Sequence, residues 1–186
     1  MTRIARTVPN VTFPVRIDDD ESGFRWGSVD TESIFAGRRV LVFSLPGAFT
    51  PTCTMNQLPG FEAYYEQLQE YGIDDIYCAS VNDTFVMNAW FRELNISKVK
   101  AIPDGTGSFT RQMGFLVDKS AIGFGLRSWR YAMIVNDKNI EVIFEEPGYG
   151  DDATDDPYLM TDPNTVLNYL KEGLIPATQQ PQDSNE

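Results

Sequence analysis

Residues 40–53 read VLVFSLPGAFTPTC, and they carry in succession the patterns of a strand, a loop and the start of a helix. The first part, residues 40–45, is a continuous apolar run rich in β-branched side chains, which is typical of a strand covered on both faces. The run stops at a Pro-Gly pair, and Thr50 then offers a capping hydroxyl before Pro51 at the first helical position. The stretch therefore predicts a buried strand that passes through a short loop into a helix.

The elements that follow repeat this order. Apolar residues at helical spacing predict a helix over roughly residues 51–71. Proline cannot donate the helical hydrogen bond, so we expect a kink at Pro59. A second apolar strand at residues 76–81 and a second amphipathic helix over residues 85–94 come next. Strand–helix–strand–helix order indicates parallel pairing, with helices packed on a central sheet.

The C-terminal half adds a hairpin and a final helix. Residues 131–135 and 140–144 flank a polar turn and are typical of an antiparallel hairpin. The last helix is expected to begin after Asp162 and to end at Gly173. The predicted fold class is α/β, a thioredoxin-like fold in which a central mixed β-sheet carries helices on both faces.

A length of 186 residues suits one domain, so we expect a single domain over residues 1–186. Residues 1–37 are interpreted as an entry segment of short strand-like pieces, with a solvated acidic turn at residues 18–21. Residues 176–186 are expected to form a disordered polar tail.

The composition excludes several classes of function. Fifteen Lys and Arg against 27 Asp and Glu give a net charge of −12, which disfavours binding to nucleic acid and to anionic membranes. The absence of His rules out a Cys–His or Ser–His catalytic pair and an HExxH zinc site. Two Cys are too few for a cysteine-only zinc site, and no metal site is expected. Because no stretch resembles a signal peptide or a membrane span, we expect a soluble cytoplasmic protein.

Cys53 is the strongest candidate for a reactive group. It follows a loop between a buried strand and a helix, where ligands of open α/β sheets bind. At about the third helical position, unpaired backbone N–H groups and the helix dipole favour a thiolate. The alternative is a small buried hydrophobic residue, but Cys53 does not lie on an apolar stripe. We therefore expect its sulfur at the mouth of the fold.

Ionisation alone cannot make this sulfur react rapidly. It raises the thiolate population by only about 30-fold, and lower nucleophilicity cancels part of that gain. Thr50 can place its hydroxyl in the same mouth. Arg127 and Arg130 precede the hairpin strand and can supply guanidinium donors, with a surface ion pair as the alternative for either.

The loop carries the signature of a known family. Residues 46–53, PGAFTPTC, match the pattern PxxxTxxC, and residues 80–90, 102–105 and 127–131 read SVNDTFVMNAW, IPDG and RSWRY. In these motifs the chain resembles the peroxiredoxin family, in its type II, peroxiredoxin V-like group, over roughly residues 8–173. It also resembles the peroxiredoxin part of bacterial peroxiredoxin–glutaredoxin hybrids, without the glutaredoxin domain.

This resemblance implies a thiol peroxidase that reduces hydrogen peroxide and alkyl hydroperoxides without metal, haem or flavin. Cys53 would be the peroxidatic cysteine, which becomes a sulfenic acid. Thr50 would hold the thiolate and the peroxide, Pro46 would shield the site, and Arg130 would stabilise the developing charge. Gly47 and Arg127 would help to bind the substrate.

Cys78 is the second cysteine. Counting the rise of the intervening helix and strand leaves about 15 Å between it and Cys53, against a disulfide limit near 7 Å. We therefore interpret Cys78 as a buried strand residue, while its pairing with Cys53 stays open. An external thiol must then reduce the sulfenic acid. The resemblance implies glutathione, a glutaredoxin or both, with thioredoxin as the alternative.

Functions other than a peroxidase remain as alternative hypotheses. A peroxide-sensing redox switch or binding protein would be oxidised at Cys53 once per chain. A thioredoxin-like disulfide exchanger is disfavoured because the helix start has one Cys and not CxxC. The resemblance also implies a homodimer. The acidic stretch at residues 145–156 is interpreted as a solvated loop, with a calcium site as the alternative.

Overall fold

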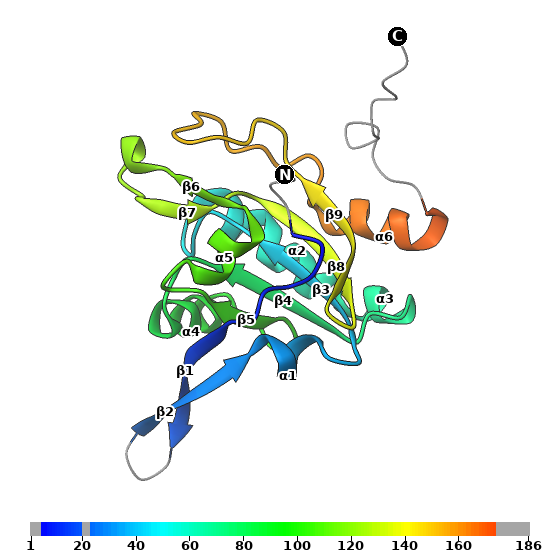
Figure 1. Ribbon diagram of the computed structural model, residues 1–186, viewed down its shortest axis with the longest axis horizontal. Coiled ribbons are helices and arrows are strands. Elements are labelled where there is room, and N and C mark those ends of the chain that lie inside the picture. Colours follow the sequence, from blue (N-terminus) through cyan, green and yellow to red (C-terminus); the bar gives the residue numbers. More distant parts are fainter. Residues whose placement is uncertain (1–4, 20–22, 174–186) are drawn as a thin grey trace.

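A five-stranded mixed sheet forms the centre of the computed structural model, which describes residues 5–19 and 23–173 (Figure 1). The strand order is β5-β4-β3-β8-β9, with β3, β4 and β5 parallel and β8 and β9 antiparallel to their neighbours. The predicted mixed sheet and C-terminal hairpin are confirmed. The strands are β3 Arg39–Ser44, β4 Asp75–Ser80, β5 Lys100–Pro103, β8 Tyr131–Asn136 and β9 Asn139–Glu145.

Helices cover both faces of this sheet because successive strand residues point to opposite sides. Leu41 and Phe43 pack into a core with α2, α3, α4 and α6, whereas Val40 and Val42 pack on the other side with α1 and α5. The predicted α/β class is therefore confirmed. The helices are α1 Thr31–Phe35, α2 Leu58–Ala63, α3 Tyr65–Glu70, α4 Thr84–Glu93, α5 Ser108–Met113 and α6 Pro163–Glu172.

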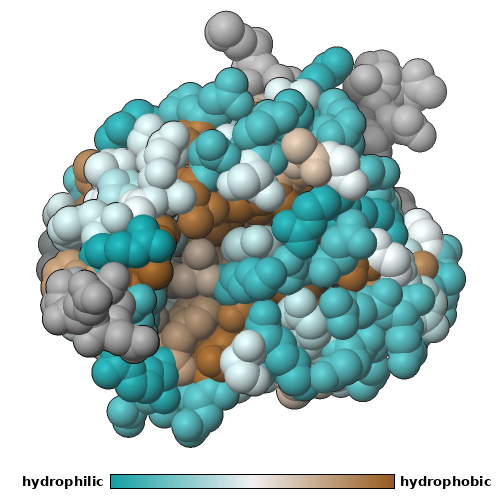
Figure 2. Space-filling model, turned by 90° about the horizontal axis from the view of Figure 1, so that it is seen from below, coloured by the Kyte–Doolittle hydropathy of each residue, from teal (hydrophilic) through white to brown (hydrophobic). Residues whose placement is uncertain are grey.

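The N-terminal segment forms a long hairpin, β1 Thr12–Asp19 and β2 Gly23–Asp30. It is attached to α4 by the Arg16 backbone N–H, which donates to Thr84 Oγ1 at 3.0 Å. The Arg16 guanidinium also lies 4.9 Å from the centre of the Phe24 ring. Figure 2 looks at the molecule from this lower side and shows hydrophobic side chains gathered in a hollow among hydrophilic ones. Of the expected acidic turn, Asp18 and Asp19 end β1, and the rest lies outside the described residues.

The long helix expected over residues 51–71 is broken into parts. A π-helical turn, Cys53–Gln57, precedes α2, and Tyr64 separates α2 from α3. In the wide turn the Leu58 N–H donates to the Cys53 carbonyl, five residues back. Pro59 has no N–H to donate and crowds the carbonyl four residues before it, which a widened turn relieves. The predicted kink is therefore a change of helix type.

Two short strands were not predicted, β6 Leu116–Asp118 and β7 Leu126–Ser128, which pair antiparallel around a 3₁₀ turn, Ser120–Ile122. The last helix, α6, begins and ends as predicted, since the Asp162 carboxylate accepts from two backbone N–H groups of its first turn. The tail predicted at residues 176–186 lies outside the described residues. Within the described part of the chain, no helix has the length and apolar character needed to cross a membrane.

Candidate active site

Cys53 is buried, so the expectation that its sulfur lies at the mouth of the fold is wrong. The residue is 0% exposed and belongs to the core that includes Leu58 and Phe61. Gln57, at the other end of the π-helical turn, is also fully buried. This side of the turn therefore faces the interior, and the sulfur is reached only past the residues that cover it.

A buried guanidinium contacts this sulfur. Arg130 is 1% exposed, and its Nη1 donates to Cys53 Sγ at 3.5 Å and to Gln57 Oε1 at 2.5 Å. Its Nη2 donates to Asp156 Oδ1 at 2.5 Å. Burial opposes the positive charge and is the largest single influence, but the negative charges of Cys53 and Asp156 outweigh it and raise the pKa of Arg130. A permanent cation is thus fixed beside the thiol.

Arg127 lies near the site but makes different contacts. Its Nε donates to the Phe124 carbonyl at 3.0 Å and its Nη1 to the Val81 carbonyl at 3.3 Å. Burial lowers the pKa of Arg127, and the charge of Cys53 counteracts part of that shift. A Cβ at Gly47 would stand 3.0 Å from Arg127 Nη1, so glycine lets this guanidinium approach the loop closely.

Thr50 points its hydroxyl at the loop backbone. Its Oγ1 donates to the Gly47 carbonyl at 2.7 Å, and neither a bond to sulfur nor the expected helix cap forms. The loop also bends at Phe49, whose φ of 64° lies in the left-handed region. Because the hydroxyl hydrogen is engaged, the oxygen of Thr50 is left to accept a hydrogen bond from a ligand.

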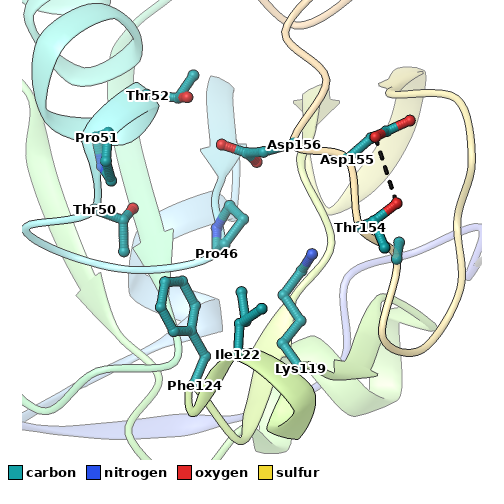
Figure 3. Close-up of a pocket in the computed structure, with 11 residues that line it drawn as sticks. Pro46, Thr50, Pro51, Thr52, Lys119, Ile122, Phe124, Thr154, Asp155 and Asp156 are labelled. Atoms are coloured by element: carbon teal, nitrogen blue, oxygen red, sulfur yellow. Dashed lines mark hydrogen bonds between the residues drawn. The ribbon is translucent and has the colours of Figure 1, made fainter.

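A cavity of about 310 Å³ lies beside the loop that leads to Cys53 (Figure 3). Its walls come from the loop that carries Pro46 and Thr50, from the turn after β6, and from a loop before α6. Thr52, next to Cys53, and Asp156, which binds the same guanidinium as Cys53, both line it, so the cavity adjoins the surroundings of the sulfur. The lining residues are Pro46, Thr50, Pro51, Thr52, Lys119, Ile122, Phe124, Ala153, Thr154, Asp155 and Asp156.

Several polar residues of the site were not predicted from the sequence. Gln57 lies four residues after Cys53, and that helical spacing was a signal that could have found it. Asp156 has no such signal, because a loop distant in sequence brings it to Arg130. The ring of Tyr158, from the same loop, lies 5.8 Å from the Arg130 guanidinium carbon.

The acidic stretch that begins at the end of β9 is partly buried rather than only solvated. Glu146 is 1% exposed, and its carboxylate accepts from the backbone N–H groups of Leu159, Met160 and Thr161. These bonds hold the loop that brings Asp156 to Arg130. Among the described residues, no three acidic or thiol side chains are grouped so that they could hold a metal ion.

Cys78 lies in β4 and is fully buried, as predicted. Burial raises the pKa of its thiol well above the usual range, and the charge of Cys53 raises it further. Both cysteines are free. The two belong to the same core on one face of the sheet.

Comparison with known proteins gives consistent matches. The family model named Redoxin matches residues 7–158. The chain is 50% identical over 178 residues to peroxiredoxin sll1621 of Synechocystis sp., covering 94% of each protein. It is 46% identical to the hybrid peroxiredoxin hyPrx5 of Haemophilus influenzae, covering 89% of this chain and 65% of that protein. The crystal structure of the Plasmodium falciparum antioxidant protein (1-Cys peroxiredoxin) matches with a TM-score of 0.83 and 38% identity, covering 89% of this chain and 97% of that one.

Proposed function

The chain belongs to the Redoxin family and is a peroxiredoxin, and from this premise we propose that Cys53 carries its peroxidase chemistry and that an external thiol restores it. The resemblance to the type II, peroxiredoxin V-like group is confirmed. The substrate class is a peroxide, as hydrogen peroxide or an alkyl hydroperoxide.

The assignment of Cys53 as the reactive cysteine rests on one observation. The Arg130 guanidinium, itself almost fully buried, lies 3.5 Å from Cys53 Sγ. Burying a cation is costly; the Asp156 carboxylate offsets part of that cost at Nη2, but a neutral thiol would stabilise Nη1 only slightly. The contact is understandable if the sulfur is a thiolate during the reaction, because the guanidinium then stabilises the nucleophile and the negative charge that develops.

The proposed oxidation transfers two electrons from sulfur to the peroxide. The Cys53 thiolate attacks one peroxide oxygen, an S–O bond forms and the O–O bond breaks. The electron pair leaves with the second oxygen, which takes a proton and departs as water or alcohol, and Cys53 becomes a sulfenic acid. Arg130 stabilises the charge as it moves from sulfur to the leaving oxygen.

Five further groups are proposed to position the peroxide or to shield the sulfur. The free lone pairs of Thr50 would accept its O–H hydrogen, because the Thr50 hydroxyl hydrogen is held by Gly47. Pro46 would shield the sulfur from water. The backbone N–H groups of Gly47 and Cys53 would donate to the peroxide oxygens, and Arg127 would add positive charge at the loop.

The proposed reductant is glutathione, a glutaredoxin or both. Burial leaves Cys78 a neutral thiol at physiological pH, which is a poor nucleophile, and this supports a cycle with one reactive cysteine. An external thiol would attack the sulfenic sulfur and release water, and a second thiol would free Cys53 from the mixed disulfide. The likeness to a hybrid peroxiredoxin and to a protein called a 1-Cys peroxiredoxin supports this route.

A turnover assay tests the assignment. With glutathione and glutaredoxin supplied, Cys53→Ser should abolish peroxide consumption, whereas Cys78→Ser should retain it. Full activity of Cys53→Ser would refute the role of Cys53. Consumption of a single peroxide per wild-type chain, with reductant present, would instead support the redox switch.

Mass spectrometry of the peroxide-treated protein tests the reductive half. A glutathione adduct on Cys53 is expected when glutathione is present. A Cys53–Cys78 disulfide would overturn the one-cysteine cycle, and faster recycling by thioredoxin than by glutathione would identify thioredoxin as the reductant.

We further propose that the protein works as a cytoplasmic homodimer without metal, haem or flavin. Sedimentation analysis should give twice the chain mass of 21.0 kDa. Cell fractionation tests the location. Protein stripped with a chelator should keep its rate, and a lost rate that returns with one metal would contradict the proposal.

A further inference from the structure

Lys119 is a buried charge that the peroxidase chemistry leaves unexplained. It follows β6, and the residue is 3% exposed. Figure 3 shows its side chain extending toward the space between Pro46 and the loop of residues 154–156. The ammonium lies 5.2 Å from the centre of the Trp129 ring, and within the described ranges it forms no ion pair and no hydrogen bond.

This arrangement leaves the ammonium undercompensated. The attraction between an aromatic face and a cation is weaker than the cost of taking a charge out of water. Neither of the two carboxylates that line the cavity pairs with this ammonium. Asp156 binds Arg130, and Asp155 accepts from Thr154 Oγ1 at 3.5 Å. The donors of Lys119 therefore face the cavity unused.

The rest of the wall suits an amphipathic molecule. Ile122, Phe124, Pro46 and Ala153 are apolar, and about 310 Å³ is the lower end of the size of small-molecule sites. Thr52, which also lines the cavity, is next to Cys53 in the chain. A ligand could therefore present its reacting group near Cys53, rest its body on the apolar wall and extend a negative group to Lys119.

We propose that Lys119 makes this cavity a carboxylate-binding subsite for a molecule that reacts at Cys53. The proposal rests on the proposed function, because it uses the same site. Two molecules of that reaction can supply the carboxylate: an organic hydroperoxide that carries one, in the oxidative half, and glutathione, in the reductive half. In both cases Lys119 selects the molecule and takes no part in bond breaking.

Lys119→Met tests this, since it removes the charge and keeps the length of the side chain. In the oxidative half, the measured quantity is the rate with linoleic acid hydroperoxide divided by the rate with uncharged cumene hydroperoxide. In the reductive half, it is the rate with glutathione divided by that with 2-mercaptoethanol. At least one ratio should fall by about 10-fold, the size of one charge-assisted hydrogen bond, and Lys119→Arg should restore part of it.

Lys171→Met is the matched control. Lys171 also lies over an aromatic ring, 5.8 Å from the centre of Tyr71, but it is in α6 and lines no part of this cavity. It should leave both ratios unchanged. A fall in the first ratio identifies the hydroperoxide as the ligand, and a fall in the second identifies glutathione.

The subsite is refuted if Lys119→Met leaves both ratios within about two-fold of the wild type, or if Lys171→Met lowers them equally. The proposed function fails separately, when the wild-type chain does not turn over hydrogen peroxide. The two failures can therefore be told apart.

Discussion

Arg130 joins three groups that come from distant parts of the chain. One nitrogen serves both Cys53 and Gln57, and the other serves Asp156. A guanidinium can do this because it presents several donors in a rigid plane, whereas an ammonium is a single point of charge. The shape of this side chain, as well as its charge, should therefore matter for the reaction.

Arg130→Lys separates shape from charge. We expect the second-order rate of oxidation by hydrogen peroxide to fall by about 10²–10³-fold, because lysine cannot hold the thiolate and both partners together. Stopped-flow fluorescence under pseudo-first-order conditions measures this rate. Arg127→Lys is the comparison, and it should lower the same oxidation rate by less than about 10-fold. Unchanged kinetics in Arg130→Ala, with a large loss in Arg127→Ala, would transfer the role to Arg127.

The π-helical turn is the element that sets the direction of Cys53. With one extra residue in the turn, Cys53 and Gln57 both face the interior, where Arg130 meets them. In a regular α-helix the angular position of Cys53 relative to α2 would differ. The widened turn therefore belongs to the geometry of the site, as such turns often do.

Pro59→Ala tests the importance of this turn. Alanine restores an N–H and removes the ring, so the turn can relax to an α-helix. We expect the oxidation rate to fall by about 10-fold or more through misplacement of the sulfur, while the circular dichroism spectrum stays that of a folded protein. An unchanged rate would mean that the proline does not maintain the turn.

The loop before α6 depends on one buried carboxylate. Glu146 accepts from three backbone N–H groups and from the Thr161 hydroxyl. Glu146→Gln brings an N–H donor against backbone N–H donors, so the free energy of unfolding should fall by about 1–3 kcal/mol. Urea denaturation measures this, with the exposed Glu93→Gln as control. An equal effect of the two substitutions would contradict the role of Glu146.

At the scale of the whole molecule, acid stability should depend on Asp75 at the start of β4. Its carboxylate accepts from Lys100 Nζ at 2.6 Å, from Tyr65 Oη at 2.9 Å, and from Arg38. Burial alone would raise the pKa of Asp75, but the hydrogen bonds from these residues outweigh it and lower the pKa below its ordinary value. The folded state thus prefers the charged form.

The lowered pKa of Asp75 determines how the free energy of unfolding depends on pH. A carboxylate with a lowered pKa stabilises the fold fully above the pKa of the unfolded chain, about 3.9, and this stabilisation is lost as the pH falls through the folded value. The wild type should therefore lose more unfolding free energy between about pH 5 and pH 2 than Asp75→Asn does. Urea titrations at both ends measure the difference, and parallel losses would exclude Asp75 as the titrating group.

Sequence patterns predicted the parts of the molecule that depend on local order. The apolar run at residues 40–45 and the proline after Asp162 fixed the first core strand and the last helix. The strands β6 and β7 were missed because three residues are too few to show a period. The π-helical turn was missed because five residues do not distinguish its period from that of an α-helix.

The candidate site likewise has residues that a local pattern identifies and contacts that form only in the folded chain. Cys53, Thr50 and Pro46 lie in one continuous loop, and a motif can identify them together. The burial of the sulfur depends instead on residues that meet it only in the folded chain, among them Arg130 and Asp156. No local pattern records such contacts, so the exposure of Cys53 could not be predicted.

The complete burial of Cys53 has a practical consequence for assays that count the free thiols of the protein. Cys53 and Cys78 have no exposed surface, so an alkylating reagent such as iodoacetamide can reach either sulfur only when the covering side chains move, as must also happen for the organic hydroperoxide and the glutathione proposed above. Alkylation of both cysteines should therefore be slow in the native protein. After unfolding, the same reagents should modify Cys53 and Cys78 rapidly.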